Sequence, residues 1–352
     1  MKIGFINDSD NRVSITPDTL KKYLNLGHKI FIEKGAGVSA GFYDESYNHK
    51  EIVSREKLLE FSDCIICVSS DSLNPLNLFK NKIVISNFSN DPNKDKLHET
   101  ISKYKITAFD LSKIPRTTIA QSMDILSSMA GLSGYKSVIK AAELLPKMFP
   151  MIITAAGSIK PAKVVVLGAG VAGLQAIATA KRLGAIVEAS DPRQAAKEEV
   201  LSLGAKFIEV DGAVEDQSAG GYAVKQSKEY LEKQKEVVSK RLKQADVVIT
   251  TAQVFGAKSP ILIPKSLVNE MKPGSVIIDL ASSTGGNCEL TKDSEIVEYN
   301  RVKIVGNSFL SSELSYDSSN LFSNNVFNFL SYIIKDDKII EEDDEIINNC
   351  KI

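Results

Sequence analysis

Three glycines at fixed spacing follow an uninterrupted apolar segment near the middle of the chain. The segment is Lys163–Leu167 (KVVVL), and Gly168, Gly170 and Gly173 come directly after it, ahead of an alanine-rich stretch. In a strand, turn and helix of this kind, the first glycine permits a tight turn and the second lets a pyrophosphate approach the backbone. The third lets the helix pack closely on the strand. The first turn of the helix then offers free N–H groups to phosphates. This pattern predicts a Rossmann βαβ unit that binds a dinucleotide.

An acidic residue at the end of the next strand indicates which dinucleotide is bound. Asp191 lies roughly 20 residues beyond the glycines, where the residue that binds the adenosine ribose is expected. A carboxylate accepts a hydrogen bond from a ribose 2′-hydroxyl and repels a 2′-phosphate, so the sequence favours NAD as cofactor. The nearby Arg193 could accommodate a 2′-phosphate, so NADP remains an alternative. The expected cofactor contacts are Gly168, Ala169, Gly170, Val171, Gly173, Asp191, Pro192 and Arg193, with Thr251 and Ala252 after a later strand.

The 352 residues exceed one ordinary domain, and about 150 residues per domain predicts two. Over the first 115 residues, short apolar segments alternate with helical ones, which predicts a parallel sheet wrapped by helices. A GAG occurs at Gly35–Gly37, but no complete fingerprint follows a strand, so we expect no dinucleotide there. The predicted strands are KIGFI, HKIFIE, DCIICV, KIVISNF and KITAFDL, and the predicted helices are Pro17–Leu26, Arg55–Phe61 and Lys94–Lys103.

We therefore predict an α/β fold of two Rossmann-like, doubly wound parallel-sheet domains joined by a long helix, of which only the second carries the fingerprint. The long helix is expected to begin near Ala120. KFIEV, DVVITT, SVIIDLA and VKIVG continue the second sheet, and Leu321–Ile334 is expected to be an amphipathic helix that returns to the first domain. The predicted domains are residues 1–121 with 318–352, and residues 122–317. The last residues, KDDKIIEEDDEIINNCKI, are interpreted as a solvated acidic tail.

Composition excludes several other classes of protein. A net charge of −1 gives no field that would attract nucleic acid, so we expect no nucleic-acid partner. No apolar run reaches the roughly 18 residues of a membrane span, and we expect a cytoplasmic protein. Cys64 and Cys67 form a CxxC within an apolar strand. Residues three apart on a strand point to opposite faces, so the pair is not expected to share a metal, and no metal site is predicted.

Three further stretches are similar to a known family. Pro115–Val138 (PRTTIAQSMDILSSMAGLSGYKSV), the segment AAGSIKPAKVVVLGAGVAGLQAIATAKRLGA, and KPGSVIIDLA with GGNCE resemble the NAD(H)-binding component of proton-translocating NAD(P) transhydrogenase. The resemblance implies a Si–Re-specific enzyme in which NADH on this component passes hydride directly to NADP+ on a separate NADP(H)-binding component. It also implies a membrane-spanning component that couples the transfer to proton movement. The chain would be a homodimer, held on the inner membrane through its partner subunits.

The resemblance also places catalytic roles on one loop, at Arg116, Gln121 and Asp124, with Ser127 one turn further on. Gln121 can both donate to and accept from the nicotinamide side, and Arg116 and Asp124 can pair and clamp the loop. Direct hydride transfer abstracts no proton, so positioning is what the protein must supply. An ion pair that merely starts a helix is the alternative interpretation of Arg116 and Asp124.

The segment SAGGYA (Ser218–Ala223) resembles the family's mobile loop, whose Gly221 and Tyr222 would contact the nucleotide. An ordinary surface loop is the alternative interpretation of this segment.

Two other functions remain alternatives. Alanine dehydrogenase shares the fold, but it needs a proton acceptor and a cationic anchor for the substrate carboxylate. Arg12 matches one part of its pattern, whereas the lysine position falls on Cys67, the histidine region on Asn87/Phe88 and the acid on Ser283. The other alternative is a stand-alone NAD-binding regulatory module that has lost the reaction. The presence of all three loop residues, Arg116, Gln121 and Asp124, argues against this alternative.

Overall fold

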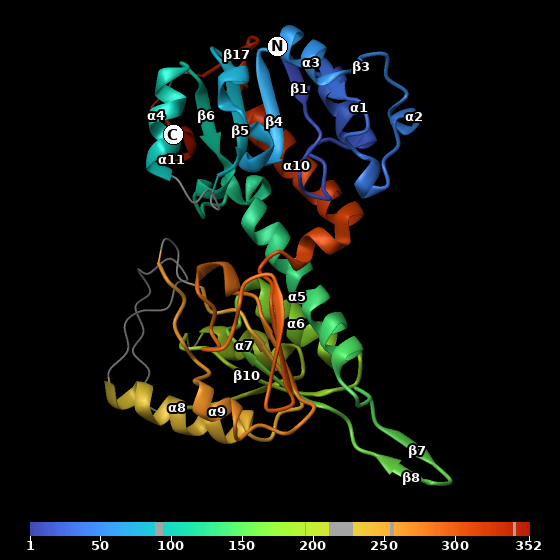
Figure 1. The fold of residues 1–352 in the computed structure, drawn as a ribbon, viewed down its shortest axis with the longest axis vertical. Coiled ribbons are helices and arrows are strands. Elements are labelled where there is room, and N and C mark those ends of the chain that lie inside the picture. The colour runs from blue at the N-terminus through green and yellow to red at the C-terminus, as the bar shows by residue number, and fades with distance from the viewer. Residues whose placement is uncertain (89–93, 194, 211–227, 254–256, 341–342) are drawn as a thin grey trace. The chain divides into compact units, whose positions relative to one another are not determined.

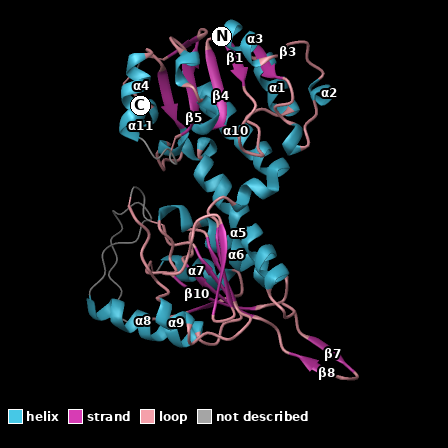
Figure 2. Ribbon diagram, viewed as in Figure 1, coloured by secondary structure: helices cyan, strands magenta, loops and turns pink. Residues whose placement is uncertain are grey.

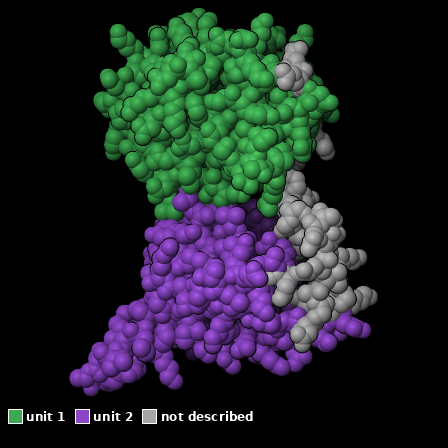
Figure 3. Space-filling view, turned by 180° about the vertical axis from the view of Figure 1, so that it is seen from behind, with its two compact units in different colours: residues 1–129, 312–352 green, residues 130–311 purple. Residues whose placement is uncertain are grey.

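The computed structural model describes the chain except for residues 89–93, 194, 211–227, 254–256 and 341–342 (Figure 1). The described residues form two compact units, coloured separately in Figure 3. The first unit comprises Met1–Met129 and Ser312–Ile352, and the second comprises Ala130–Ser311. The limits predicted from the sequence, 121/122 and 317/318, lie before the first of these divisions and after the second.

A six-stranded, all-parallel sheet lies at the centre of the first unit (Figures 1 and 2). Its order is β3-β2-β1-β4-β5-β6. The strands are β1 (Lys2–Phe5), β2 (Lys29–Glu33), β3 (Ile52–Val53), β4 (Cys64–Ser69), β5 (Ile83–Asn87) and β6 (Thr107–Asp110). The helices are α1 (Pro17–Asn25), α2 (Asp44–Tyr47), α3 (Arg55–Phe61), α4 (Lys94–Lys103), α10 (Ser315–Ile333) and α11 (Glu345–Cys350).

Strand β4 shows why these continuous apolar segments form a parallel sheet. Cys64 and Ile66 belong to one hydrophobic cluster of the unit, whereas Ile65 and Cys67 belong to the other. A strand that is buried on both faces needs apolar residues at every position, as parallel sheets covered by helices do. The two cysteines therefore lie on opposite faces, which confirms that part of the prediction.

The end of the chain differs from the predicted solvated tail. Helix α11 is capped by Asp344, whose side chain accepts hydrogen bonds from the amides of Ile346 and Ile347 at 2.9 and 3.0 Å. Ile346, Ile347 and Cys350 are buried, and the Ile352 amide donates to the Ala108 carbonyl at 3.0 Å. The prediction was wrong because it weighed the acidic residues and overlooked the apolar face formed by these helical positions.

A seven-stranded sheet forms the second unit, in the order β11-β10-β9-β12-β13-β15-β14, and only β14 is antiparallel to its neighbour. The chain order reverses at β9, which makes the space beyond β9 and β12 a topological switch point, where open α/β sheets bind ligands. The strands are β9 (Lys163–Leu167), β10 (Ile186–Ser190), β11 (Lys206–Phe207), β12 (Val247–Thr250), β13 (Val276–Asp279), β14 (Glu295–Tyr299) and β15 (Val302–Gly306). The helices are α6 (Val171–Arg182), α7 (Ala195–Ser202), α8 (Lys228–Leu242) and α9 (Lys265–Val268).

Two further elements complete the chain. Helix α5 (Ile125–Leu144) contains the division between the units at Met129 and Ala130. It begins after the predicted start near Ala120, because Ala120–Met123 form a 3₁₀ turn and Asp124 is extended. Strands β7 (Ile152–Thr154) and β8 (Gly157–Ile159) pair as an isolated hairpin (Figure 2). Among the described residues, no helix is both long and apolar enough to cross a membrane.

Candidate functional site

The glycine turn of the second unit connects β9 to α6, as its sequence predicts. Gly168 has a φ of +98°, and a Cβ atom there would lie 2.5 Å from Thr251 Oγ1. A Cβ atom on Gly173 would overlap with the Gly168 carbonyl, so this glycine is required for the close approach of helix and turn. A Cβ atom on Gly170 would meet nothing within 4 Å. Packing therefore explains Gly168 and Gly173, whereas Gly170 keeps open the space in front of the first turn of α6.

Asp191 lies beside this turn, directly after β10, and is only 7% exposed. Its Oδ2 accepts from the Ala169 amide at 2.7 Å, and its Oδ1 accepts from the backbone amide and Nε of Arg193, both at 2.9 Å. Arg193 Nη2 also donates to Oδ2 at 3.0 Å. The hydrogen bond to Asp191 raises the pKa of Arg193, against the opposing effect of burial. The Arg193 guanidinium is thus paired with the Asp191 carboxylate in this structure.

The chain after β12 closes the other side of the turn. The Thr251 amide donates to the Leu167 carbonyl at 2.9 Å, and Thr251 Oγ1 donates to the Gly168 carbonyl at 3.1 Å. Ala252 follows and is held by the Asn287 side chain, to which its amide donates at 3.0 Å. The structure therefore gathers the predicted residues Gly168–Val171, Gly173, Asp191–Arg193, Thr251 and Ala252 at one edge of the sheet. Gly221 and Tyr222 lie outside the described residues.

A dinucleotide fits the chemistry of this edge. The open space at Gly170 adjoins the N-terminus of α6, where backbone N–H groups and the helix dipole favour a pyrophosphate. The Asp191 carboxylate lies next to the turn, as a group that binds a ribose hydroxyl must. No group of three or more metal-binding side chains occurs among the residues that the structure describes.

The predicted catalytic residues come together in the first unit. Arg116, Gln121, Asp124 and Ser127, with Pro115, line a pocket of about 320 Å³. Asp124 accepts from the amide and the hydroxyl of Ser127 at 2.9 and 2.6 Å, and so it caps the first turn of α5. These contacts of Asp124 are those of a helix cap, and the pairing of Asp124 with Arg116 stays a prediction.

Helix α10 supports the 3₁₀ turn that carries Gln121. The side-chain amides of Asn325 and Asn328 both donate to the Ser122 carbonyl, at 2.8 and 2.9 Å. Ala120 and Met123 are buried on either side, while the Gln121 side chain is exposed. The turn is therefore anchored at its ends and presents Gln121 outward. Sequence reasoning missed the two asparagines, because nothing local links them to a loop some 200 positions earlier.

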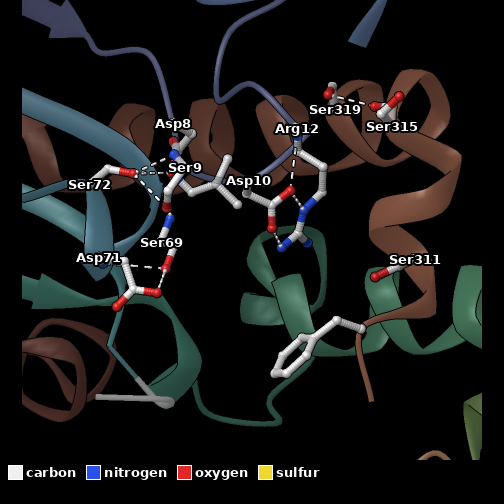
Figure 4. Close-up of polar contacts among 12 residues, drawn as sticks. Asp8, Ser9, Asp10, Arg12, Ser69, Asp71, Ser72, Ser311, Ser315 and Ser319 are labelled. Atoms are coloured by element: carbon white, nitrogen blue, oxygen red, sulfur yellow. Dashed lines mark hydrogen bonds and ion pairs between the residues drawn. The ribbon is translucent and has the colours of Figure 1, made fainter. Parts of the chain in front are cut away.

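The residues that would serve an amino-acid dehydrogenase are arranged differently. Arg12 is 8% exposed, and its Nε and Nη2 donate to the Asp10 carboxylate at 2.9 and 2.6 Å (Figure 4). The Arg12 guanidinium therefore already holds a carboxylate of the chain itself. Cys67 is buried, burial raises the pKa of its thiol, and it donates to Ser86 Oγ at 3.2 Å.

Two fully buried residues lie at the same edge of the sheet as the glycine turn, and the sequence analysis predicted no role for them. They are Asp279, which ends β13, and Asn287, which follows Gly285 and Gly286. A polar residue at or directly after the end of an apolar strand, the signal that singled out Asp191, could have found Asp279, whereas Asn287 lies in a loop and carries no such signal.

Fold and site together define a two-unit Rossmann-like protein whose second unit carries a glycine turn of the type that binds dinucleotides. Family models agree: residues 6–133 match the alanine dehydrogenase/PNT N-terminal domain, and residues 137–352 match the alanine dehydrogenase/PNT C-terminal domain. The chain belongs to the alanine dehydrogenase/PNT family.

Individual relatives point to one branch of that family. The chain is 42% identical to a Rhodospirillum rubrum protein named as the first part of NAD(P) transhydrogenase subunit alpha, over 97% of this chain and 92% of that protein. The crystal structure of a transhydrogenase from Sinorhizobium meliloti matches with a TM-score of 0.90 at 34% identity, covering 100% of this chain and 98% of that one. A solved L-alanine dehydrogenase has a TM-score of 0.78 at 23% identity, covering 94% and 90%, which shows the shared fold.

Proposed function

We propose that this chain is the NAD(H)-binding component of a proton-translocating NAD(P) transhydrogenase. It would pass hydride directly between its own NADH and NADP+ held on a partner component, and a membrane-spanning partner would couple the transfer to proton movement. The observation that carries the proposal is the pocket formed by Arg116, Gln121, Asp124 and Ser127. The partner components are inferred by analogy with the transhydrogenase relatives named above.

The chain's own residues have positioning roles in this proposal. Bound NADH supplies the hydride, so no residue of the chain needs to accept a proton. The pyrophosphate would lie at Gly170 and the first turn of α6, and Asp191 would accept from a ribose hydroxyl. The exposed carboxamide of Gln121 offers both a donor group and an acceptor oxygen, which suits the carboxamide of a nicotinamide. Alignment of two nicotinamides then accounts for the rate enhancement.

A homodimer is part of the proposal, and the β7–β8 hairpin supports it. Met151, Ile153 and Ile159 on and beside this hairpin are 60%, 72% and 45% exposed. An isolated two-stranded hairpin is only marginally stable in water, so apolar side chains on it need a covering surface. A second copy of the chain would supply that surface, and the assembly would sit on the cytoplasmic face of the inner membrane through its partner subunits.

Reconstitution tests the proposal. The chain is mixed with the NADP(H)-binding component of a transhydrogenase, and reduction of an NADP+ analogue by NADH is followed by absorbance. Transfer that requires both components supports the proposal. Normal NADH binding without transfer would refute it and would favour the stand-alone NAD-binding module instead.

A further inference from the structure

Asp279 organises the loop that follows β13, at the same edge of the sheet as the glycine turn. Its Oδ1 accepts from Thr250 Oγ1 and the Ala281 amide, both at 3.0 Å. Its Oδ2 accepts from the amides of Asn287 and Cys288 and from Thr291 Oγ1, at 2.7, 3.0 and 2.6 Å. Five donors thus surround one carboxylate that is 0% exposed. Such a buried group is tolerated because every lone pair is used, and it fixes the backbone that donates to it.

Gly286 shows how closely the loop wraps around this carboxylate. It has a φ of +77°, and a Cβ atom on it would lie 2.8 Å from Asp279 Oδ2. The next residue, Asn287, is held by its amide on the same oxygen. The direction of the Asn287 side chain is therefore set by Asp279.

Asn287 uses its whole side-chain amide to hold the chain beyond β12. Its Oδ1 accepts from the Ala252 amide at 3.0 Å, and its Nδ2 donates to the carbonyls of Ala252 and Pro260 at 2.8 and 2.9 Å. Its carboxamide thus both accepts from and donates to the backbone of Ala252. Asn287 is 0% exposed, so these hydrogen bonds are shielded from bulk solvent.

These contacts form a chain of direct bonds that ends at the nucleotide turn. Asp279 holds Asn287, Asn287 holds Ala252, and the adjoining Thr251 donates to the Gly168 carbonyl. We propose that Asp279 and Asn287 are positioning residues of the nucleotide site, which hold Thr251 and Ala252 against the glycine turn and thereby set the affinity for NADH. This inference rests on the proposed NAD(H) binding and adds residues that touch no cofactor.

The test is NADH titration of the full chain, followed by NADH fluorescence. Asn287→Asp keeps the size of the side chain but turns an acceptor toward the Ala252 and Pro260 carbonyls. We expect its Kd for NADH to rise about tenfold, since a buried hydrogen-bond pair is lost. Asp246→Asn is the matched control: Asp246 is also buried in this unit, but it lies before β12, at the opposite edge of the sheet, where it accepts from Lys147 and Lys272 at 2.8 and 3.0 Å. The control should lower the Tm and leave the Kd unchanged.

A double-mutant cycle separates positioning from general stability. If Asn287 acts through its neighbour Thr251, then Asn287→Asp should cost less affinity in a Thr251→Ala background than in the wild type. If Asn287→Asp does not fold, Thr250→Val removes one donor to Asp279 and should raise the Kd by about threefold.

Three results would overturn the inference: a Kd unchanged in Asn287→Asp, additive effects in the cycle, or an equal rise in Asp246→Asn. The first of these, with normal NADH binding by the wild type, would leave the proposed function standing. A wild type that binds no NADH would overturn both.

Discussion

Gly170 and Gly173 belong to one motif, yet the structure predicts opposite consequences for the same substitution. Gly173→Ala would place a Cβ atom 2.8 Å from the carbonyl carbon of Gly168 and closer still to its oxygen, both of which are backbone atoms that cannot rotate away. Overpacking of this kind costs about 1–3 kcal/mol or more. We therefore expect Gly173→Ala to lower the free energy of unfolding by at least that amount.

Gly170→Ala should leave the fold intact and remove binding. Gly170 has a φ of −77° and a ψ of −167°, which alanine adopts without strain, and its Cβ atom would meet nothing within 4 Å. Alanine restricts the unfolded chain more than glycine does, which stabilises the folded state, but N-cap positions prefer glycine to alanine. These two effects offset each other, so the free energy of unfolding should change by less than about 1 kcal/mol. The added methyl group occupies the space that a pyrophosphate needs, and the Kd for NADH should rise at least about tenfold.

Urea unfolding monitored by circular dichroism and NADH titration monitored by fluorescence, applied to both variants, measure the two effects separately. Wild-type NADH affinity in Gly170→Ala would refute the assignment of the open space to the pyrophosphate. Wild-type stability in Gly173→Ala would refute the packing role of that glycine.

Three more predictions concern other parts of the chain. Gln121→Asn retracts the carboxamide by one methylene, so hydride transfer in the reconstituted system should fall by about 10- to 100-fold while the Kd for NADH changes little; an equal loss of both would mean that Gln121 only binds. Ile153→Asp should convert a dimer to a monomer in size-exclusion chromatography with light scattering, whereas Ile296→Asp, at another exposed isoleucine of the second unit, should not; dissociation of both or neither would contradict the role of the hairpin. Burial raises the pKa of Asp8 to about 6 from its ordinary 3.8, so its contribution to stability is complete below pH 3.8 and is lost as the pH rises through 6. The loss amounts to about 3 kcal/mol, and Asp8→Asn should abolish it in urea unfolding at different pH values; a pH dependence unchanged in the variant would count against the assignment.

The sequence predicted the sheets well because their signals are local. Val164 and Val166 face one cluster of the second unit, and Val165 and Leu167 face the other, so an uninterrupted apolar segment was enough to identify β9. The glycine turn was equally readable, since its spacing reflects contacts within one βαβ unit.

Features that depend on distant partners could not be predicted. Asn287 is an ordinary loop residue until Asp279 fixes its direction and Ala252 meets its amide. The start of α5 was misplaced because Asp124 leaves the helical conformation to cap the helix through Ser127, a choice that competes closely with continuing the helix. For Asn287 the deciding partner Ala252 lies 35 positions away. For Asp124 the partner Ser127 is only three positions away, and the pattern does not tell which of two competing local structures forms.

The division of the first unit into two separated segments has a consequence for the growing polypeptide. The second unit is one continuous stretch of 182 residues (130 to 311), which must be synthesised before α10 emerges. At about 5–20 residues per second, that takes roughly 10 to 40 seconds. Throughout this interval the sheet of the first unit lacks Phe322, Val326 and Phe329 of α10, which complete one of its two hydrophobic clusters. One hydrophobic cluster around the first sheet therefore stays incomplete until α10 has been synthesised.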